Sequence, residues 1–225
     1  MNGPLSEKRV APSILAADYG RLSAQVADVL DAGARVIHVD VMDGHFVPPI
    51  TVGPLIVDAL REQVHEVDGA LDVHLMIEAP ERHVAAFARA GADSITIHWE
   101  ATPHVHYALN SVHEAGCLSG LAINPATPPS VVAGVADIVD TVLCMTVNPG
   151  WGGQTFIESS PGRVAELSET KAPGSALEVD GGINEDNAPS CADAGATLFV
   201  AGSSVFGAAD PADAYRRLAT VAGAA

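Results

Sequence analysis

The sequence predicts a (β/α)₈ barrel that forms one domain over residues 1–225. Short runs rich in β-branched residues alternate with alanine-rich amphipathic stretches along the whole chain. Glycines that follow the helix-like stretches are separated by one, two or three multiples of roughly 25 to 30 residues, the size of a βα unit. The chain length corresponds to about eight such units. An open, doubly wound sheet is the alternative, since it has the same local pattern.

Each element of the predicted barrel has its own stretch of sequence. The strand-like runs are, in chain order, Val10–Leu15, Val36–Val41, Asp72–Met76, Ser94–His98, Gly120–Asn124, Val142–Val147, Leu177–Asp180 and Leu198–Ala201. The helix-like stretches include Tyr19–Ala32, Pro54–Val64, Glu81–Ala90, Val105–Ala115 and Ala188–Ala194. Four of these five helices end in an Ala-Gly pair, whose glycine can take the left-handed conformation that stops a helix: Gly33, Gly91, Gly116 and Gly195.

The composition argues against several classes of protein. Asp and Glu number 28 and Lys and Arg 11, so the formal net charge is −17. Binding to nucleic acid or to an anionic membrane requires basic patches, so we expect neither partner. A hydrophobic content of 48% and a mean hydropathy of +0.24 exclude a disordered chain. The acidic composition also leaves few cations to bind an anionic ligand.

The cysteines and the N-terminal residues indicate a reducing compartment. Cys117, Cys144 and Cys191 are odd in number and form no CxxC motif, which argues against a disulfide framework or a zinc ribbon. The first 20 residues contain no apolar signal segment, and no stretch is long enough to span a membrane. We therefore expect a cytoplasmic protein.

Alternation along the strands predicts a polar site inside the barrel. In the run RVIHVDVMDG, a period of two puts His38 and Asp40 on one face and aliphatic residues on the other. The run LDVHLMI repeats the arrangement with Asp72 and His74, and Asp180 ends the seventh strand. Each side chain alone can be explained as a buried, hydrogen-bonded polar group. Three strands that direct His or Asp to one mouth favour a His₂Asp₂ site for Zn²⁺, with Fe²⁺, Mn²⁺ and Co²⁺ as alternatives.

Glycine-bearing loops follow the last three predicted strands, at Asn148–Phe156, Asp180–Ile183 and Ala201–Gly207. Glycines let backbone N–H groups approach an anion, and a short helix starting at Ser203–Ser204 would direct its N-terminus toward it. Glycine pairs also occur simply in tight turns. Because barrels often bind phosphate after strands seven and eight, the three loops together favour a phosphate site.

Other residues support less specific expectations. His98 ends the fourth strand, where a role beside the site and a purely structural role are both open. No GxGxxG follows the first strand, which argues against a dinucleotide cofactor. Three methionines near strand ends are ordinary core residues that could also surround a substrate: Met42, Met76 and Met145. Three histidines are expected on the surface or on helices: His104, His106 and His113.

Seven motifs, in this order, resemble the ribulose-phosphate 3-epimerase family: APSILAADYGRL, HVDVMDGHFVPPITVGP, DVHLMI, INPATP, MTVNPGWGGQTF, VDGGI and VAGSSVFG. The resemblance extends from about Val10 to Gly207. It implies a (β/α)₈ barrel and a divalent-metal enzyme that interconverts D-ribulose 5-phosphate and D-xylulose 5-phosphate. It also implies a homo-oligomer that acts in carbohydrate metabolism, such as the pentose phosphate pathway. No organic cofactor is expected.

The resemblance implies a role for each matching position. The implied metal ligands are His38, Asp40, His74 and Asp180, of which Asp40 and Asp180 also form the acid/base pair. The implied substrate contacts are Ser13, His74 and Asp180, the loop Gly150, Trp151, Gly152 and Gly153, and the phosphate-binding residues Gly181, Gly182, Gly202 and Ser203. Periodicity alone does not indicate Ser13. The chain departs from many relatives at Pro49, where they have Asn, and at Trp151, where they have Phe, which puts loop geometry in doubt.

Two acid/base groups suit the implied reaction. Epimerisation beside a ketone removes a proton from one face of a carbon and returns one to the other face. Asp40 and Asp180 lie on strands two and seven and can therefore stand on opposite sides of a substrate. A carboxylate is a weak base, with an ordinary pKa of about 3.9, so a metal is needed to polarise the C2 carbonyl and stabilise the enediolate.

Three alternative functions remain open. An epimerase of the same family that acts on a six-carbon ketose phosphate, such as D-allulose 6-phosphate, would differ in pocket length. A phosphate-binding barrel decarboxylase typically pairs Asp with an active-site lysine, but Lys8 and Lys171, the only lysines, lie at no predicted strand end. A non-enzymatic sugar-phosphate binder would need no opposed carboxylates.

Overall fold

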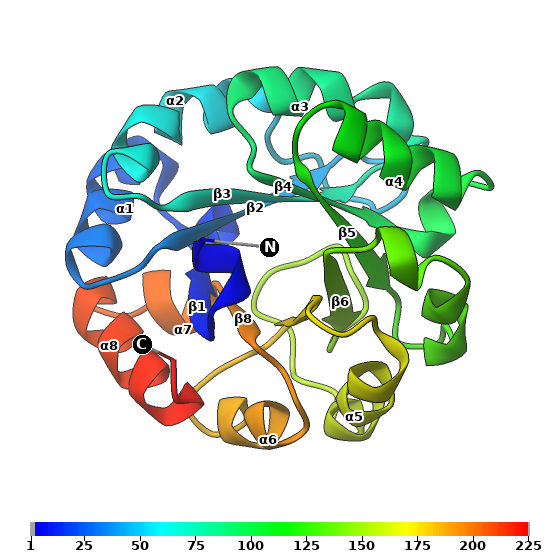
Figure 1. Ribbon diagram of the computed structural model, residues 1–225. Coiled ribbons are helices and arrows are strands. Elements are labelled where there is room, and N and C mark those ends of the chain that lie inside the picture. The colour runs from blue at the N-terminus through cyan, green and yellow to red at the C-terminus, as the bar shows by residue number, and fades with distance from the viewer. Residues whose placement is uncertain (1–2, 225) are drawn as a thin grey trace.

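Eight parallel strands form a barrel in the computed structural model, which describes residues 3–224 (Figure 1). The strands are β1 Arg9–Pro12, β2 Val36–Met42, β3 Ala70–Met76, β4 Ser94–His98, β5 Leu118–Ile123, β6 Thr141–Met145, β7 Ala176–Asp180 and β8 Leu198–Ala201. They pair in the order β1-β8-β7-β6-β5-β4-β3-β2, and an isolated parallel bridge between Ser13 and His38 links the two end strands. The barrel prediction is confirmed, and the open doubly wound sheet is wrong. Residues 1, 2 and 225 of the predicted domain lie outside the described residues.

Helices surround the barrel (Figure 1). They are α1 Leu22–Asp31, α2 Pro54–His65, α3 Val84–Ala90, α4 Val105–Glu114, α5 Ser160–Thr170, α6 Ala188–Asp193, α7 Ser203–Phe206 and α8 Pro211–Ala222. The expected stretch Tyr19–Ala32 is divided, because a 3₁₀ turn capped by the Asp18 side chain precedes α1. Between β5 and β6 the chain forms two 3₁₀ segments, Pro129–Gly134 and Ala136–Ile138. The four glycines expected at helix ends have φ between +86° and +113°, as a left-handed stop requires.

Strand alternation divides the buried side chains into an outer and an inner set. All seven residues of β2 are buried, because helices cover the outer face of the strand and the barrel interior covers the other. Ile37, Val39 and Val41 belong to the main core between strands and helices. Val36 belongs to a separate cluster that also contains Ala11 and Leu198. His38 and Asp40 lie on the inner face of the same strand. The alternation of side chains along β2 therefore places core residues on one face and the candidate site residues on the other.

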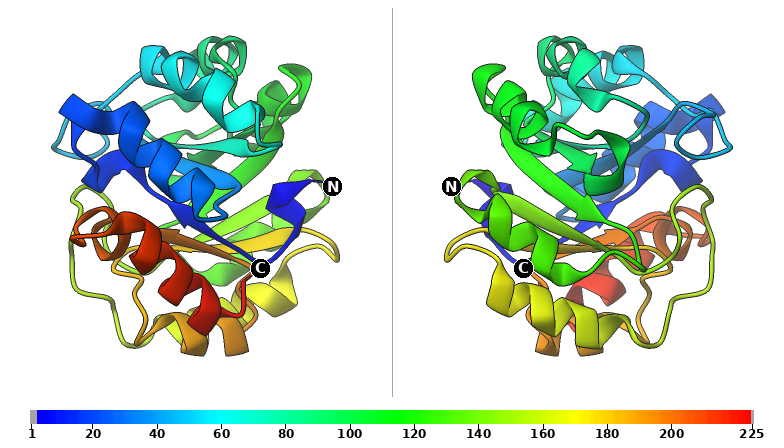
Figure 2. Two further views of the ribbon diagram at one scale, coloured as in Figure 1. Left: turned by 90° about the vertical axis from the view of Figure 1, so that its left-hand side faces the viewer. Right: turned by 90° about the vertical axis from the view of Figure 1, so that its right-hand side faces the viewer.

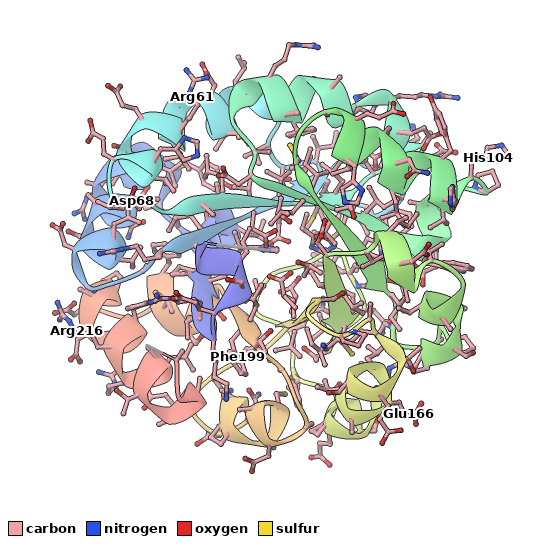
Figure 3. All side chains as sticks on the ribbon, in the orientation of Figure 1. Arg61, Asp68, His104, Glu166, Phe199 and Arg216 are labelled. Carbon is pink, nitrogen blue, oxygen red and sulfur yellow. The ribbon has the colours of Figure 1, made fainter. Side chains whose placement is uncertain are left out.

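Charged side chains lie on the outer surface of the helical ring. Arg61, Asp68, Glu166 and Arg216 are exposed, whereas Phe199 on β8 is fully buried (Figure 3). Cys117, Cys144 and Cys191 are buried free thiols. Among residues 3–224, no helix is both long enough and apolar enough to cross a membrane.

Loops at the carboxyl ends of the strands form the mouth of the barrel. In side view, the N-terminal segment lies at the opposite end from the long loop that follows β6 (Figure 2). Asp43, just after β2, accepts backbone N–H bonds from His45 and Phe46 and one from Glu78, which follows β3. These three bonds outweigh burial and lower the pKa of the Asp43 carboxyl. The carboxylate therefore joins two neighbouring loops of the mouth.

The barrel interior leaves no room for a side chain at position 120. Gly120 on β5 pairs with Thr96 on β4, and a Cβ atom there would lie 1.9 Å from Thr96 Oγ1 and 2.9 Å from its Cα. We expect Gly120→Ala to lower the free energy of unfolding by about 1–3 kcal/mol, because overpacking forces the strands to shift. Gly162→Ala is the matched control, since Gly162 is exposed in α5 and a Cβ there meets nothing within 4 Å. That change should stabilise the protein by about 0.5 kcal/mol. Urea unfolding of the three proteins measures both effects, and equal stabilities would contradict this packing.

Candidate metal centre and substrate pocket

Four polar side chains meet at the mouth of the barrel. His38 and Asp40 come from β2, His74 from β3 and Asp180 from the end of β7, and their ligand atoms all lie within 4.8 Å of one another. His38 Nε2 is 3.3 Å from Asp40 Oδ1. His74 Nδ1 is 3.1 Å from Asp40 Oδ1 and 3.6 Å from Asp180 Oδ2. The four residues that the sequence grouped together are therefore neighbours in space.

The cluster fits a divalent cation. It contains two imidazole nitrogens and two carboxylates, a donor set that suits Zn²⁺ and related metals. His38 Nε2 is buried and has no hydrogen-bond partner among the described residues. Such an atom is costly to bury unless something binds it. A cation would accept both this lone pair and the charges of the carboxylates.

The two aspartates differ in their electrostatic surroundings. Burial opposes ionisation of Asp40, but the charge and close contact of His38, followed by those of His74, outweigh it and hold the pKa of Asp40 far below its ordinary value. Burial raises the pKa of Asp180, and the neighbouring Asp40 charge raises it further. The protein surroundings therefore favour a proton on Asp180 over one on Asp40.

Further side chains hold these four in place. His38 Nδ1 lies 2.7 Å from Asp72 Oδ2 and 3.6 Å from Glu178 Oε1, so its Nε2 faces the cluster. Burial, followed by the charge of Asp72, raises the pKa of Glu178 well above its ordinary value. On the other side, the Ser13 hydroxyl donates to Asp40 Oδ2 at 2.5 Å. Ser13, expected as a substrate contact, thus faces one of the two aspartates.

A pocket opens beside the cluster and contains nearly all of the expected substrate contacts. The expected contacts that line it are Ser13, Gly150, Trp151, Gly152, Gly153, Asp180, Gly181, Gly182, Gly202 and Ser203. His74, also expected as a substrate contact, is not among the residues that line the pocket. Asp40 also lines the pocket, as do the three methionines of strand ends, Met42, Met76 and Met145. Within the described part of the chain, no lysine or arginine lines this pocket. An anionic group in it would therefore meet backbone, hydroxyl groups or a bound cation.

The glycine loops pack closely at one end of this pocket. Gly182 has φ +68°, and a Cβ there would lie 2.7 Å from the carbonyl oxygen of Gln154 and 2.8 Å from the N atom of Phe156. The loop after β7 can therefore approach the loop after β6 only because residue 182 is glycine. The short helix α7 begins at Ser203, as expected, and the Ser204 hydroxyl donates to the carbonyl of Ile183.

The sequence interpretation did not resolve the role of His98. Its Nε2 lies 2.8 Å from Nε2 of His74, so it is in direct contact with the cluster. The signal was available, because the alternation of Ser94, Thr96 and His98 along β4 matches that of β3. His104, His106 and His113 are exposed and outside the cluster, as expected, and His104 projects from the rim of the molecule (Figure 3).

A parallel eight-stranded barrel with acidic and imidazole side chains at its carboxyl-end mouth defines a class of barrel enzyme with a site suited to a metal ion. The model of the ribulose-phosphate 3 epimerase family matches residues 9–206, and the chain belongs to this family.

Individual relatives agree with this assignment. The chain is 50% identical to ribulose-phosphate 3-epimerase of Bacillus subtilis, over 90% of this chain and 94% of that protein. It is 49% identical to chloroplastic ribulose-5-phosphate-3-epimerase of Arabidopsis thaliana, over 92% of this chain and 74% of that protein. Among solved structures, 3-hexulose-6-phosphate synthase from Salmonella typhimurium superposes with a TM-score of 0.72, at 15% identity over 95% of this chain and 98% of that one. This last likeness concerns the fold alone.

The geometry of the cluster predicts one divalent cation for each chain. After dialysis against Zn²⁺ and gel filtration, elemental analysis should find about one equivalent in the wild type and far less in His38→Ala, which lacks a ligand. His104→Ala is the control, since that exposed histidine is remote from the cluster, and it should retain the metal. Equal zinc content in the wild type and His38→Ala would contradict a site at this cluster.

Proposed function

We propose that the chain is a metal-dependent epimerase that interconverts D-ribulose 5-phosphate and D-xylulose 5-phosphate by proton transfer at C3. The observation that carries the proposal is the pair Asp40 and Asp180, which come from β2 and β7 and line the same pocket. The names of the relatives of this chain, ribulose-phosphate 3-epimerase and ribulose-5-phosphate-3-epimerase, support the reaction and the five-carbon substrate. A homo-oligomeric state and a cytoplasmic location stay predictions.

The two aspartates share the proton transfers. In one direction, one carboxylate removes the C3 proton from one face of the sugar and the other carboxyl returns a proton to the opposite face. In the reverse direction the roles exchange. The Ser13 hydroxyl donates a hydrogen bond to Asp40 Oδ2 and fixes the orientation of that carboxylate. Nδ1 of His74 contacts both aspartates, at 3.1 Å from Asp40 Oδ1 and 3.6 Å from Asp180 Oδ2. Fixed orientation lowers the entropic cost of reaching the reactive geometry.

The metal ligands in this proposal are His38, Asp40, His74 and Asp180. A divalent cation, with Zn²⁺ as the first candidate and Fe²⁺, Mn²⁺ or Co²⁺ as alternatives, supplies polarisation of the C2 carbonyl and charge stabilisation for the enediolate. The methionine side chains that line the pocket exclude water from the reacting carbon. The chemistry requires no organic cofactor.

The phosphate end of the substrate is assigned to the glycine loops. Gly181, Gly182, Gly202 and Ser203 line the pocket together, and backbone N–H groups can approach an anion most closely at glycines. Among residues 3–224, no lysine of the kind that a decarboxylase of the alternative type would use lines the pocket. Lys171 instead donates to the Ser175 carbonyl at the end of α5.

Loss of either aspartate should abolish epimerisation. Asp40→Asn and Asp180→Asn each keep the size of the side chain but remove an acid/base group, so we expect turnover to fall about 10²–10⁴-fold. The measurement is a coupled assay with D-ribulose 5-phosphate, with unfolding curves to confirm that the variants fold. Asp193→Asn, at the end of the outer helix α6, is the control and should retain full activity. Substantial activity in Asp40→Asn or Asp180→Asn would remove that residue from the mechanism.

The absence of cationic side chains from the pocket lining predicts an unusual salt dependence. The net charge of −17 repels an anionic substrate at long range, and salt screens this repulsion. Raising the KCl concentration from about 10 to 150 mM should therefore lower the KM for the sugar phosphate. A site that held phosphate through lysine or arginine would show the opposite trend, so a rising KM would contradict the assignment.

Substrate length separates the proposal from its nearest rival. The kcat/KM values for D-ribulose 5-phosphate and D-allulose 6-phosphate, measured with the same preparation, should favour the pentose phosphate.

Chelation should remove activity toward both sugars, and Zn²⁺ or Mn²⁺ should restore it. A preference for the hexose phosphate would reassign the substrate, and full activity in protein shown to be metal-free would overturn the metal-dependent mechanism.

A further inference from the structure

His74 contacts a second buried histidine, His98, that takes no part in the proposed reaction. Their Nε2 atoms are 2.8 Å apart, and their ring centroids are separated by 4.9 Å with 26° between the planes. Both rings are fully buried. Two imidazole nitrogens at this distance form a hydrogen bond only if one carries a proton and the other accepts it. Nδ1 of His74 faces the cluster, and the direction of that bond decides whether this nitrogen carries a proton or a free lone pair.

Glu100 determines the direction. Nδ1 of His98 lies 3.3 Å from Glu100 Oε2. The other oxygen of Glu100 accepts bonds from the N–H of Asn124, at 2.9 Å, and from the Thr127 hydroxyl. Burial opposes ionisation, but the contact with His98 and the bonds from Thr127 and Asn124 outweigh it and lower the pKa of Glu100. With Asn124 and Thr127 both donating to it, this carboxylate is an acceptor. His98 must therefore carry its proton on Nδ1, which leaves its Nε2 as the acceptor for His74.

We propose that His98 and Glu100 are positioning residues that hold His74 with Nε2 as donor and Nδ1 as the metal-binding nitrogen. This inference rests on the metal-dependent function proposed above. Nδ1 of His74 is the nitrogen that lies near both Asp40 and Asp180. The chain of contacts from Thr127 and Asn124 through Glu100 and His98 therefore fixes one metal ligand from the β5 side of the barrel.

The second histidine of the cluster, His38, presents its other ring nitrogen to the site. His38 directs Nε2 to the cluster, because its Nδ1 contacts Asp72 directly. The two histidines therefore have separate supports, Asp72 for His38 and His98 for His74. Asp72 lies beneath the cluster inside the barrel, whereas Glu100 follows β4 at the rim and reaches His74 only through the His98 ring. The side chain at position 98 must accept a hydrogen bond from His74 on one side and donate one to Glu100 on the other, as a neutral imidazole can.

Zinc affinity of three variants tests the role of His98. His98→Phe keeps a ring of similar size beside Phe46, whose ring centroid is 4.9 Å from that of His98, but removes the acceptor for His74. Loss of such an outer partner should weaken Zn²⁺ binding about 10–100-fold, measured by competition with a chelator. His98→Gln, whose amide oxygen can accept from His74, should recover most of the affinity. His113→Phe is the matched control: His113 pairs with Asp140 at 2.7 Å on the outer surface, and its loss should leave zinc affinity unchanged.

Imidazole NMR of the wild type gives an independent readout that does not depend on variant folding. In the zinc-loaded protein, long-range ¹⁵N–¹H correlations should show His98 protonated at Nδ1 only and His74 protonated at Nε2 only. A proton on Nε2 of His98 would overturn the proposed direction of the chain.

The outcomes separate this inference from the proposed function. If the wild type binds none of Zn²⁺, Fe²⁺, Mn²⁺ and Co²⁺, the metal-dependent function fails and the positioning role fails with it. If the wild type binds zinc and His98→Phe binds it equally well, only the positioning role is overturned. Reduced affinity in His98→Phe, recovery in His98→Gln and unchanged affinity in His113→Phe would together support it.

Discussion

The structure depends on keeping two carboxylates and two imidazoles together at a buried position. Charged groups lose favourable interactions with water when they are buried, so they must be paired, hydrogen-bonded or bound to a cation. Asp40 meets this requirement through Ser13 and the two histidines, and His38 meets it through Asp72. Inner positions of β2, β3, β4 and β7 carry the polar side chains of this network, such as Asp40, Asp72 and His98, while the outer positions of the same strands are aliphatic.

The same arrangement explains how an acidic protein can accommodate an anionic ligand. The net charge of −17 is spread over a molecule whose exposed charges lie on the outer helices (Figure 3), whereas the pocket is lined by glycines, methionines and a few polar groups. Close packing between the loops after β6 and β7 requires glycine at position 182. In the proposed site, backbone N–H groups replace basic side chains, and a bound cation offsets part of the local negative charge.

The alternation of strand residues predicted much of the site, because a parallel strand directs every second side chain into the barrel. This alternation is enough to group four residues from the sequence alone: His38, Asp40, His74 and Asp180. The Ser13–Asp40 bond could not, since it depends on the stagger that brings β1 beside β2 where the barrel closes. The contact between His98 and His74 likewise depends on ring orientations across two strands. Helices α5 and α8 were not predicted individually, although the buried residues Ala214, Leu218 and Ala222 of α8 follow helical spacing.

Isotope exchange at C3 tests the central claim, that two opposed aspartates move a proton on and off that carbon. The wild-type protein loaded with Zn²⁺ is incubated with D-ribulose 5-phosphate in D₂O, and the D-xylulose 5-phosphate formed is analysed by NMR and mass spectrometry. Our account predicts one solvent deuterium at C3 of the product and none at other carbons. Product that retains its original hydrogen at C3 would show that the proton removed is also the proton returned, which would contradict two opposed acid/base groups.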